Sequence, residues 1–78
     1  MHFTYPVINL IKTGKNIENL RKKANMTVKD LQMHFGFESP QAIYKWQWGQ
    51  CLPTIDNLVV LAKLFNVTID KLLIVSDR

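Results

Sequence analysis

The chain has 78 residues, which is enough for one domain and too short for an enzyme core with a separate cofactor-binding half. Hydrophobic residues make up 47% of it, and Gly and Pro occur three times each, which excludes a disordered or collagen-like chain. Ten Lys and Arg against six Asp and Glu give a formal net charge of +4, so a polyanion is the favoured partner and nucleic acid the first candidate.

The cysteine and histidine residues predict neither a disulfide nor a metal site. Cys51 is the single cysteine, so no internal disulfide can form and the fold must be held by its hydrophobic core, as suits the cytoplasm. No apolar run approaches the ~20 residues that a membrane span needs. His2 and His34 have no Cys, Asp or His partner at metal-ligand spacing. Ser39, His34 and Cys51 match no pattern of nucleophile and base, so we expect no enzyme, no cofactor and no small-molecule substrate.

The amino-terminal part divides into an arm and a first helix. Residues 1–12 show no helical period and include Pro6, which predicts an extended arm that packs its apolar side chains on the body. From Thr13 onward the pattern changes and predicts a helix over residues 14–25 with Thr13 at its cap. The apolar face of this helix consists of Ile17, Leu20 and Ala24.

Two further helices are predicted in the middle of the chain. Thr27 begins Thr-Val-Lys-Asp, a hydroxyl cap with a carboxylate three residues later, and Gly36 stands where that helix must end. The Ser39-Pro40 pair predicts a third helix over residues 40–48, because Ser caps well and Pro is tolerated in the first turn. The second helix turns Val28, Leu31 and Phe35 inward.

The carboxyl-terminal part predicts two more helices. Thr54 caps a helix that ends near Asn66, and its apolar stripe is Leu58, Leu61, Ala62 and Phe65. Thr68 opens a last helix with Leu72 and Leu73 inward, and residues 76–78 form a frayed tail. With no convincing strand, the prediction is an all-α domain of five helices over residues 13–75.

Residues 27–49 have the spacing of a helix-turn-helix. The second helix of such a pair can lie in the major groove of DNA, which is ~12 Å wide and accepts one helix. Any helical bundle contains helix pairs of this kind, so the spacing alone leaves DNA binding and a plain bundle equally favoured.

Matches at fixed offsets run through residues 14–74. They are Asn16-Ile-x-x-Leu20-Arg21, Met26-Thr27-x-x-x-Leu31, Phe35-Gly36-Phe37, Ile43-x-x-Trp46-x-x-Gly49, Pro53-Thr54 and Leu58-x-x-Leu61-Ala62-x-x-Phe65-x-Val67-Thr68-Ile69-Asp70-x-Leu72. This pattern resembles the lambda-repressor-like, Cro-type helix-turn-helix family, also called XRE-type regulators. The resemblance implies a sequence-specific transcriptional regulator that binds double-stranded DNA.

The resemblance also implies contacts for the helix over residues 40–48. Ser39 matches the cap whose backbone N–H faces a phosphate, and Gln41 matches a base-reading position that can bond adenine through N6 and N7. Ala42 matches a contact to a thymine methyl. Lys45 can reach guanine or a phosphate, and Tyr44 can offer its hydroxyl to the DNA backbone.

Four other positions complete the predicted interface. By the same resemblance, Val28 and Lys29 begin the helix that crosses the DNA backbone. Trp48 and Gln50 match the loop that meets the opposite strand. From the residues alone, exposure of Trp48 beside DNA and packing under residues 51–53 are equally favoured.

Three positions depart from the family pattern. Pro40 stands where relatives often place a base-contacting Gln, and Glu38 resembles a one-residue insertion in the turn. Gln47 replaces the usual Glu partner of Arg21, which predicts a neutral hydrogen bond instead of an ion pair. Ile43 and Trp46 are expected in the core beneath the helix.

Two functions from different classes follow. The favoured one is a repressor that acts as a homodimer, with the dimer surface on residues 72–75 of the last helix. The alternative is a protein-interaction module, such as an antitoxin-like or accessory partner, which keeps the fold and reads bases weakly, as Pro40 and Glu38 would allow. A gel shift with a salt titration distinguishes them.

Overall fold

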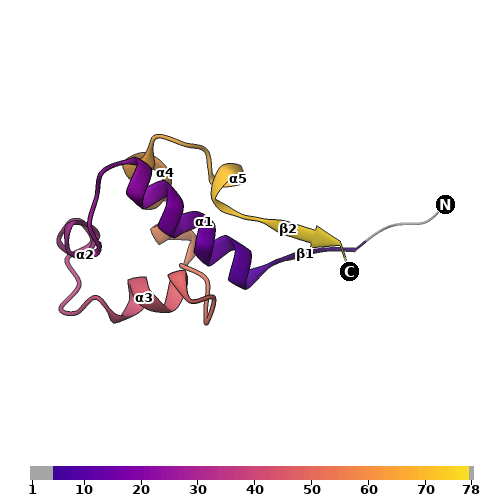
Figure 1. The fold of residues 1–78 in the computed structure, drawn as a ribbon, viewed down its shortest axis with the longest axis horizontal. Helices are drawn as coiled ribbons and strands as arrows, with labels where there is room; N and C mark the ends of the chain where they lie inside the picture. Colours follow the sequence, from indigo (N-terminus) through magenta and orange to yellow (C-terminus); the bar gives the residue numbers. More distant parts are fainter. Residues whose placement is uncertain (1–4, 78) are drawn as a thin grey trace.

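The computed structural model describes residues 5–77, which form five α-helices and one two-stranded antiparallel sheet (Figure 1). The predicted five-helix fold is confirmed. The elements in chain order are β1 (Pro6–Ile8), α1 (Leu10–Lys23), α2 (Val28–Phe35), α3 (Gln41–Gln47), α4 (Ile55–Phe65), α5 (Ile69–Leu72) and β2 (Val75–Asp77).

All five helices contribute to one hydrophobic core. Leu31 from α2 and Ile43 from α3 are fully buried, as the apolar spacing predicts. Trp46 is also buried, so the predicted position of Ile43 and Trp46 beneath α3 is confirmed. The buried hydrophobic residues are Ile17, Leu31, Ile43, Trp46, Leu58, Leu61, Phe65 and Leu72.

Helix α1 begins at Leu10, so the prediction of a helix over residues 14–25 was wrong at both ends. Asn9 is the N-cap, and its side chain accepts a hydrogen bond from the Lys12 backbone N–H at 2.9 Å. Thr13 is therefore no cap but lies buried inside the helix. Leu10 and the following residue are exposed, so the buried apolar stripe of the helix starts only at Ile17. The hydrophobic pattern in the sequence therefore does not indicate the first helical turn.

The two ends of the described part of the chain pair as a short ribbon, here called the terminal ribbon (β1 and β2) (Figure 1). Val7 lies opposite Ser76, and below this pair the Asn9 backbone N–H donates to the Ile74 carbonyl at 2.8 Å. The chain therefore has strands that the sequence did not predict, and Val75–Asp77 is a strand where a frayed tail was expected. The part of the predicted arm in residues 1–4, with His2, lies outside the described residues, as does residue 78.

The predicted caps of α2 and α4 are confirmed. Thr27 accepts from the Asp30 N–H at 3.0 Å, while the Asp30 carboxylate accepts from the Thr27 N–H at 2.8 Å. Thr54 accepts from the Asn57 N–H at 3.3 Å at the start of α4. Thr68 occupies the N-cap position of α5 without a side-chain hydrogen bond. Of the helices between Leu10 and Leu72, none has the length and hydrophobicity to span a membrane.

Candidate nucleic-acid interface

The turn between α2 and α3 consists of residues 36–40. Gly36 ends α2 with a left-handed φ of 71°, as predicted from its position. Helix α3 is shorter than the predicted helix over residues 40–48. Pro40 has a ψ of 5° and is the N-cap, so only its carbonyl takes part in the helix, where it accepts a hydrogen bond from the Tyr44 N–H at 3.2 Å. Ser39 is therefore one position outside the N-cap, and its hydroxyl oxygen accepts the Gln41 N–H over a long 3.5 Å.

Three aromatic rings hold this turn against the core. Phe35 and Phe37 stack with ring centroids 5.0 Å apart. Both rings meet Trp46 edge to face, at 5.5 Å and 6.0 Å respectively. Each such pair contributes about 0.5–1.5 kcal/mol beyond its buried area. The cluster therefore fixes the angle between the end of α2 and the buried side of α3.

Two glycines allow α1 and the end of α3 to approach closely. A Cβ on Gly14 would clash with the Trp46 carbonyl oxygen and lie 2.7 Å from that of Gln47. A Cβ on Gly49, whose φ is +76°, would lie 2.8 Å from the Ile11 Cα. Backbone meets backbone at both places, so neither contact can be relieved by a side-chain rotation. Helix α3 is therefore seated directly on α1.

Arg21 ties three segments together at this contact. Its Nε donates to the Gln47 side-chain oxygen at 3.0 Å, and its Nη1 donates to the Met26 carbonyl at 2.7 Å. The predicted replacement of an ion pair by a hydrogen bond between Arg21 and Gln47 is confirmed. This hydrogen bond links α1 and α3, and the bond to Met26 adds the turn before α2. Arg21 therefore helps to position α3 through a contact that contains no carboxylate.

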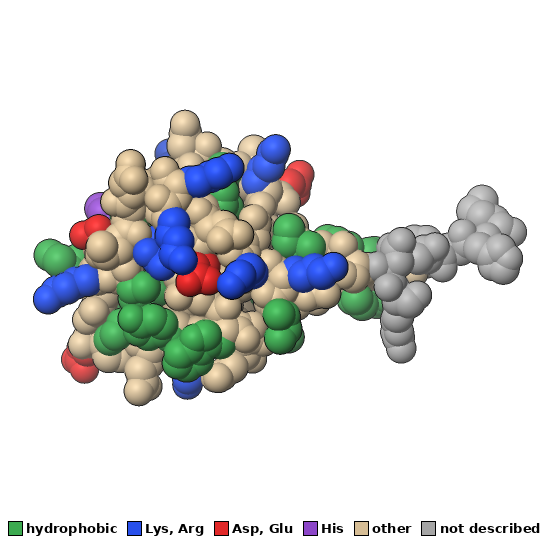
Figure 2. Space-filling view, viewed as in Figure 1, with side chains coloured by type: hydrophobic (Ala, Val, Ile, Leu, Met, Phe, Trp, Pro, Cys, Tyr) green, Lys and Arg blue, Asp and Glu red, His purple; other side chains and the backbone are tan. Residues whose placement is uncertain are grey.

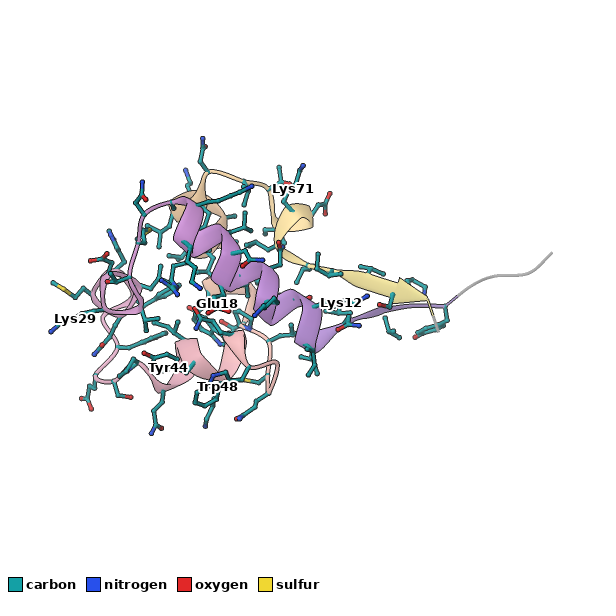
Figure 3. All side chains as sticks on the ribbon, viewed as in Figure 1. Lys12, Glu18, Lys29, Tyr44, Trp48 and Lys71 are labelled. Atoms are coloured by element: carbon teal, nitrogen blue, oxygen red, sulfur yellow. The ribbon has the colours of Figure 1, made fainter. Side chains whose placement is uncertain are left out.

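The opposite side of α3 is exposed and carries four of the predicted contact residues. Gln41 and Lys45 are exposed, one helical turn apart, opposite the buried side chains of α3. Tyr44 is 37% exposed and Trp48 60%, and their rings stack with centroids 5.6 Å apart (Figure 3). The four side chains line a shallow depression of about 150 Å³.

The sequence left two environments for Trp48 equally favoured, exposure at the surface and packing under residues 51–53. The structure shows that the Trp48 side chain is exposed. It does not pack under residues 51–53 but lies against Tyr44 at the end of α3. The stack itself was not predicted, although the signal for it was present. Residues 44 and 48 are four apart, the spacing at which side chains on a helix meet.

The remaining predicted contact residues differ in how much surface they offer. Val28 and Ala42 are half-buried and pack against the core, so little of either side chain can reach a ligand. Lys29, Ser39 and Gln50 are exposed. Their positions surround α3 in the chain: the start of α2, the turn, and the loop after α3.

Basic side chains lie on both flanks of α3. Lys29 on α2 and Lys12 on α1 lie at opposite ends of the helical body in this view, with α3 between them (Figure 3). Figure 2 shows further Lys and Arg side chains over α1 and hydrophobic side chains over α3. The sequence pattern placed Lys12 in the arm, whereas the structure places it in the first turn of α1.

Two carboxylates on this part of the molecule are engaged locally. Glu18 lies 3.8 Å from Lys15 and 3.5 Å from Lys22, which neutralises its charge on the surface of α1. The Thr27 backbone N–H, which donates to Asp30, lowers the pKa of the Asp30 carboxyl, and the Thr27 hydroxyl contact lowers it further. Glu38 is exposed in the turn.

A helix-turn-helix family model matches residues 17–72, which include α2, the turn and α3. The chain belongs to the helix-turn-helix family of DNA-binding transcriptional regulators. This confirms the resemblance to XRE-type regulators drawn from the sequence motifs. The match also covers α4 and α5, so the family pattern extends through most of the core.

One relative and one solved structure support the family assignment. The HTH-type transcriptional activator BcrR of Enterococcus faecalis is 36% identical over 60 residues, which are 77% of this chain and 29% of BcrR. The chain thus spans under a third of that relative's length. The DNA-binding domain of BldD superposes with a TM-score of 0.70 over 85% of this chain and 94% of that domain, at 16% identity, which shows a shared fold.

Proposed function

We propose that this chain binds a specific sequence of double-stranded DNA with α3 in the major groove and thereby regulates transcription. The observation that carries the proposal is the two-sided construction of α3. Its inner side is locked to the core by Trp46, while Gln41, Tyr44, Lys45 and Trp48 are left at the surface. A helix fixed in this way presents base-reading groups in one geometry.

Gln41 and Lys45 are the proposed base readers. A Gln amide can bond adenine N6 and N7 at once, and a Lys ammonium can bond guanine O6 and N7. Both side chains are exposed and neither has a hydrogen bond to another side chain among those described. They are therefore available to exchange water for base edges.

The stacked Tyr44 and Trp48 rings supply an apolar wall beside these two residues. Stacking restricts the rotamers of both rings, so less conformational entropy is lost when DNA covers them. The exposed ring surface suits thymine methyl groups and sugar carbons, and the Tyr44 hydroxyl can reach the DNA backbone. This wall compensates for Pro40, which offers no hydrogen-bond donor.

Phosphate contacts are proposed for Lys29, Ser39 and Gln50, which are exposed on three segments around α3. Contacts on both sides of the groove fix the position of α3 without reading sequence. Val28 and Ala42 add only the part of their surface that the core leaves free. The exposed carboxylate of Glu38 must point away from the phosphates.

We further propose that two copies bind a two-fold site, since a lone module covers only ~600–1,000 Å² and reads few bases. The two half-sites would lie ~34 Å apart, one helical turn of DNA. Repression is the expected outcome, because a protein bound at a promoter excludes others, whereas activation needs a further contact. BcrR is named an activator, so the reporter assay below measures both directions.

The test is selection of bound duplexes from a random pool, followed by binding measurements on the selected site and on a scrambled duplex at several salt concentrations. We expect a two-fold consensus and a preference of at least ~10³ for the selected site. A promoter carrying that site should respond to the protein in a reporter assay. Equal binding to both duplexes would contradict the proposal and favour the protein-interaction module.

A further inference from the structure

A groove runs along the side of α1 that faces away from α3. It consists of two adjoining hollows of about 430 Å³ and 550 Å³, both open to solvent. Helix α1, the end of α4, the turn after α4 and α5 all contribute side chains to it. The lining residues, here called the lysine groove, are Asn16, Asn19, Leu20, Lys22, Lys23, Ala24, Phe65, Val67 and Lys71.

The position of the lysine groove on α1 separates it from the proposed DNA-binding surface. The backbone of α1 meets the end of α3 at Gly14. Lys23 follows nine residues later, which is about two and a half turns of a helix, so it projects from the opposite side of α1. In Figure 3 Lys71 lies on the other side of α1 from Tyr44 and Trp48. DNA held against α3 would therefore leave the lysine groove uncovered.

The rim of the lysine groove is positively charged. Lys22, Lys23 and Lys71 are exposed, and no Asp or Glu is among the described residues that line the groove. Glu18 lies outside the groove, 3.5 Å from Lys22, and compensates that one charge. Within residues 5–77, Lys23 and Lys71 have no ion pair. The rim therefore attracts a ligand that carries several negative charges.

The floor of the lysine groove is apolar. Phe65 is the most buried of the lining residues, with 8% of its surface exposed. Leu20, Ala24 and Val67 are half-buried and pack against the core, so each leaves part of its side chain facing the groove. A ligand that fills the groove must therefore offer apolar groups as well as negative charge.

Hydrogen bonds from one side chain hold the two walls of the groove together. The Asn16 side-chain N–H₂ donates to the Lys71 carbonyl at 2.6 Å and to the Leu72 carbonyl at 3.0 Å, which fixes α5 against α1. On the α1 wall the groove extends from Asn16 to Ala24, which is about two helical turns, or ~12 Å. The groove is thus formed before a ligand binds, and its length suits two turns of a second helix.

We propose that the lysine groove binds an acidic amphipathic helix of another protein. Apolar side chains of the partner, three or four residues apart, lie against Leu20 and Val67. Asp and Glu side chains that flank them pair with Lys23 and Lys71. The contact uses a different side of the molecule from α3, so a chain bound to DNA can hold the partner at the same time.

The composition and shape of the groove favour this occupant over three others. A nucleic-acid backbone would pair with the lysines but leave the apolar floor without a partner. A small molecule is typically buried over 70–90% of its surface, which hollows open to solvent do not provide. A second copy of this chain, with its net charge of +4, would be repelled by the rim.

The lysine groove is also separate from residues 72–75, which the sequence favoured as a dimer surface on the last helix. None of these residues lines the groove. Helix α5 ends at Leu72, which is fully buried, and the residues after it lead into β2, so residues 72–75 form no helix face. A partner in the lysine groove therefore leaves these residues uncovered.

The experiment selects peptides of ~15 residues, about four helical turns, from a random phage-displayed library on the full chain without DNA. The enriched peptides should carry Asp or Glu beside Leu, Phe or Trp at helical spacing. Affinities are then measured for one synthetic peptide, for its form with Gln in place of Glu and Asn in place of Asp, and for its form with Ser in place of the apolar residues. Both altered peptides should bind at least about tenfold more weakly, because charge and apolar contact are both required.

Variants of the protein locate the bound peptide. Lys23→Glu, which changes a residue shared by both hollows, should raise the dissociation constant of the selected peptide about tenfold. Lys71→Glu should act in the same direction from the opposite wall. Lys15→Glu is the matched control, because it makes the same change of charge on α1 outside the groove and should have little effect. Circular dichroism verifies that each variant is folded.

Three results would overturn the proposal: no enriched peptide, enriched peptides without acidic residues, or equal effects of Lys23→Glu and Lys15→Glu. A lower salt slope of DNA binding in Lys23→Glu than in Lys15→Glu would assign the groove to phosphate instead. With a selected duplex bound, the affinity for the peptide should be unchanged. Because peptide binding is measured without DNA, it stands or falls separately from the proposed DNA recognition by α3.

Discussion

The helix-turn-helix unit and the terminal ribbon are held by different interactions. In the first, α3 is fixed by the ring cluster around Trp46 and by direct backbone contact at Gly14. In the second, hydrogen bonds join residues 61 and 67 positions apart, through Thr13 and Asn9. A packed core therefore orients the proposed DNA-binding surface, whereas a few backbone and side-chain hydrogen bonds hold the terminal ribbon.

The largest expected effect comes from Gly14→Ala in the helix-turn-helix unit. The added methyl would collide with the Trp46 and Gln47 carbonyl oxygens and push α3 away from α1. We expect a loss of about 3 kcal/mol or more in the free energy of unfolding. Overpacking against side chains already costs ~1–3 kcal/mol, and backbone atoms move aside less easily than side chains do. Urea denaturation and a gel shift on the selected site measure both consequences.

Gly36→Ala is the matched control for this prediction. Its Cβ would meet nothing within 4 Å, but its φ of +71° disfavours any side chain. We expect about 1–2 kcal/mol of destabilisation from the left-handed conformation, with DNA binding retained wherever the protein is folded. If Gly14→Ala proves as mild as Gly36→Ala, α3 is not seated on α1 as rigidly as described.

The next effect concerns the anchor of the ribbon. The Thr13 hydroxyl is buried and accepts the Ile74 N–H at 2.9 Å. Thr13→Val keeps the shape and leaves that N–H without a partner, which costs about 1–3 kcal/mol. Hydrogen exchange at residues 74–76 should accelerate, while affinity for a single half-site stays unchanged. Thr13→Ser, which keeps the hydroxyl, should behave like the wild type.

The same contrast explains what the sequence could predict. The helices α2 and α4 carry their signals locally, in Thr27 and Thr54 followed by apolar residues at helical spacing. The ribbon has no local signal, because Val7 finds Ser76 only after the helices have packed. The start of α1 was missed for the same reason, since Thr13 looked like a cap and is in fact bonded to the other end of the chain.

The exposed side of α3 could be predicted from the sequence, but the arrangement of its side chains and the bounds of the helix could not. The spacing placed Gln41 and Lys45 opposite Ile43 and Trp46, and the exposed and buried sides of α3 agree with it. The predicted bounds of α3 were each wrong by one residue. At its start, Pro40 adopts a turn conformation instead of the first helical position. Helical periodicity identifies a face, whereas the bounds depend on backbone angles that a sequence does not state.

Within the helix-turn-helix unit, Gln41→Ala separates specificity from affinity. Loss of a bidentate contact to adenine should cost about 1–3 kcal/mol of binding on the selected duplex and relax the choice at one base pair. Binding to the scrambled duplex should change little, since phosphate contacts remain. An unchanged ratio between the two duplexes would mean that Gln41 does not read a base.

Lys29→Ala should show the opposite behaviour and a smaller effect on specificity. Removing one phosphate contact weakens every DNA sequence alike and lowers the slope of log affinity against log salt by about one unit. Lys63→Ala on α4 is the control, because Lys63 lines a hollow between α4 and the start of α5 to which α2 and α3 contribute no residue. If both variants change the slope equally, the basic surface acts through net charge and not through placed contacts.

The smallest effect is a pH dependence that belongs to one of the two regions only. The Thr27 N–H lowers the pKa of Asp30 below its ordinary value of 3.8, so the ionised cap stabilises the folded helix-turn-helix unit. Because the folded pKa is depressed, this stabilisation is present above the ordinary value and is lost as the pH falls through the lowered one. The stability difference between wild type and Asp30→Asn should therefore be constant near neutrality and vanish in acid.

Asn9→Ala removes the uncharged cap at the base of the ribbon, and its stability difference from wild type should carry no such acid-dependent step. Unfolding midpoints in urea from neutral to acidic pH compare the two, and a parallel decline in both differences would assign the acid sensitivity to groups other than Asp30.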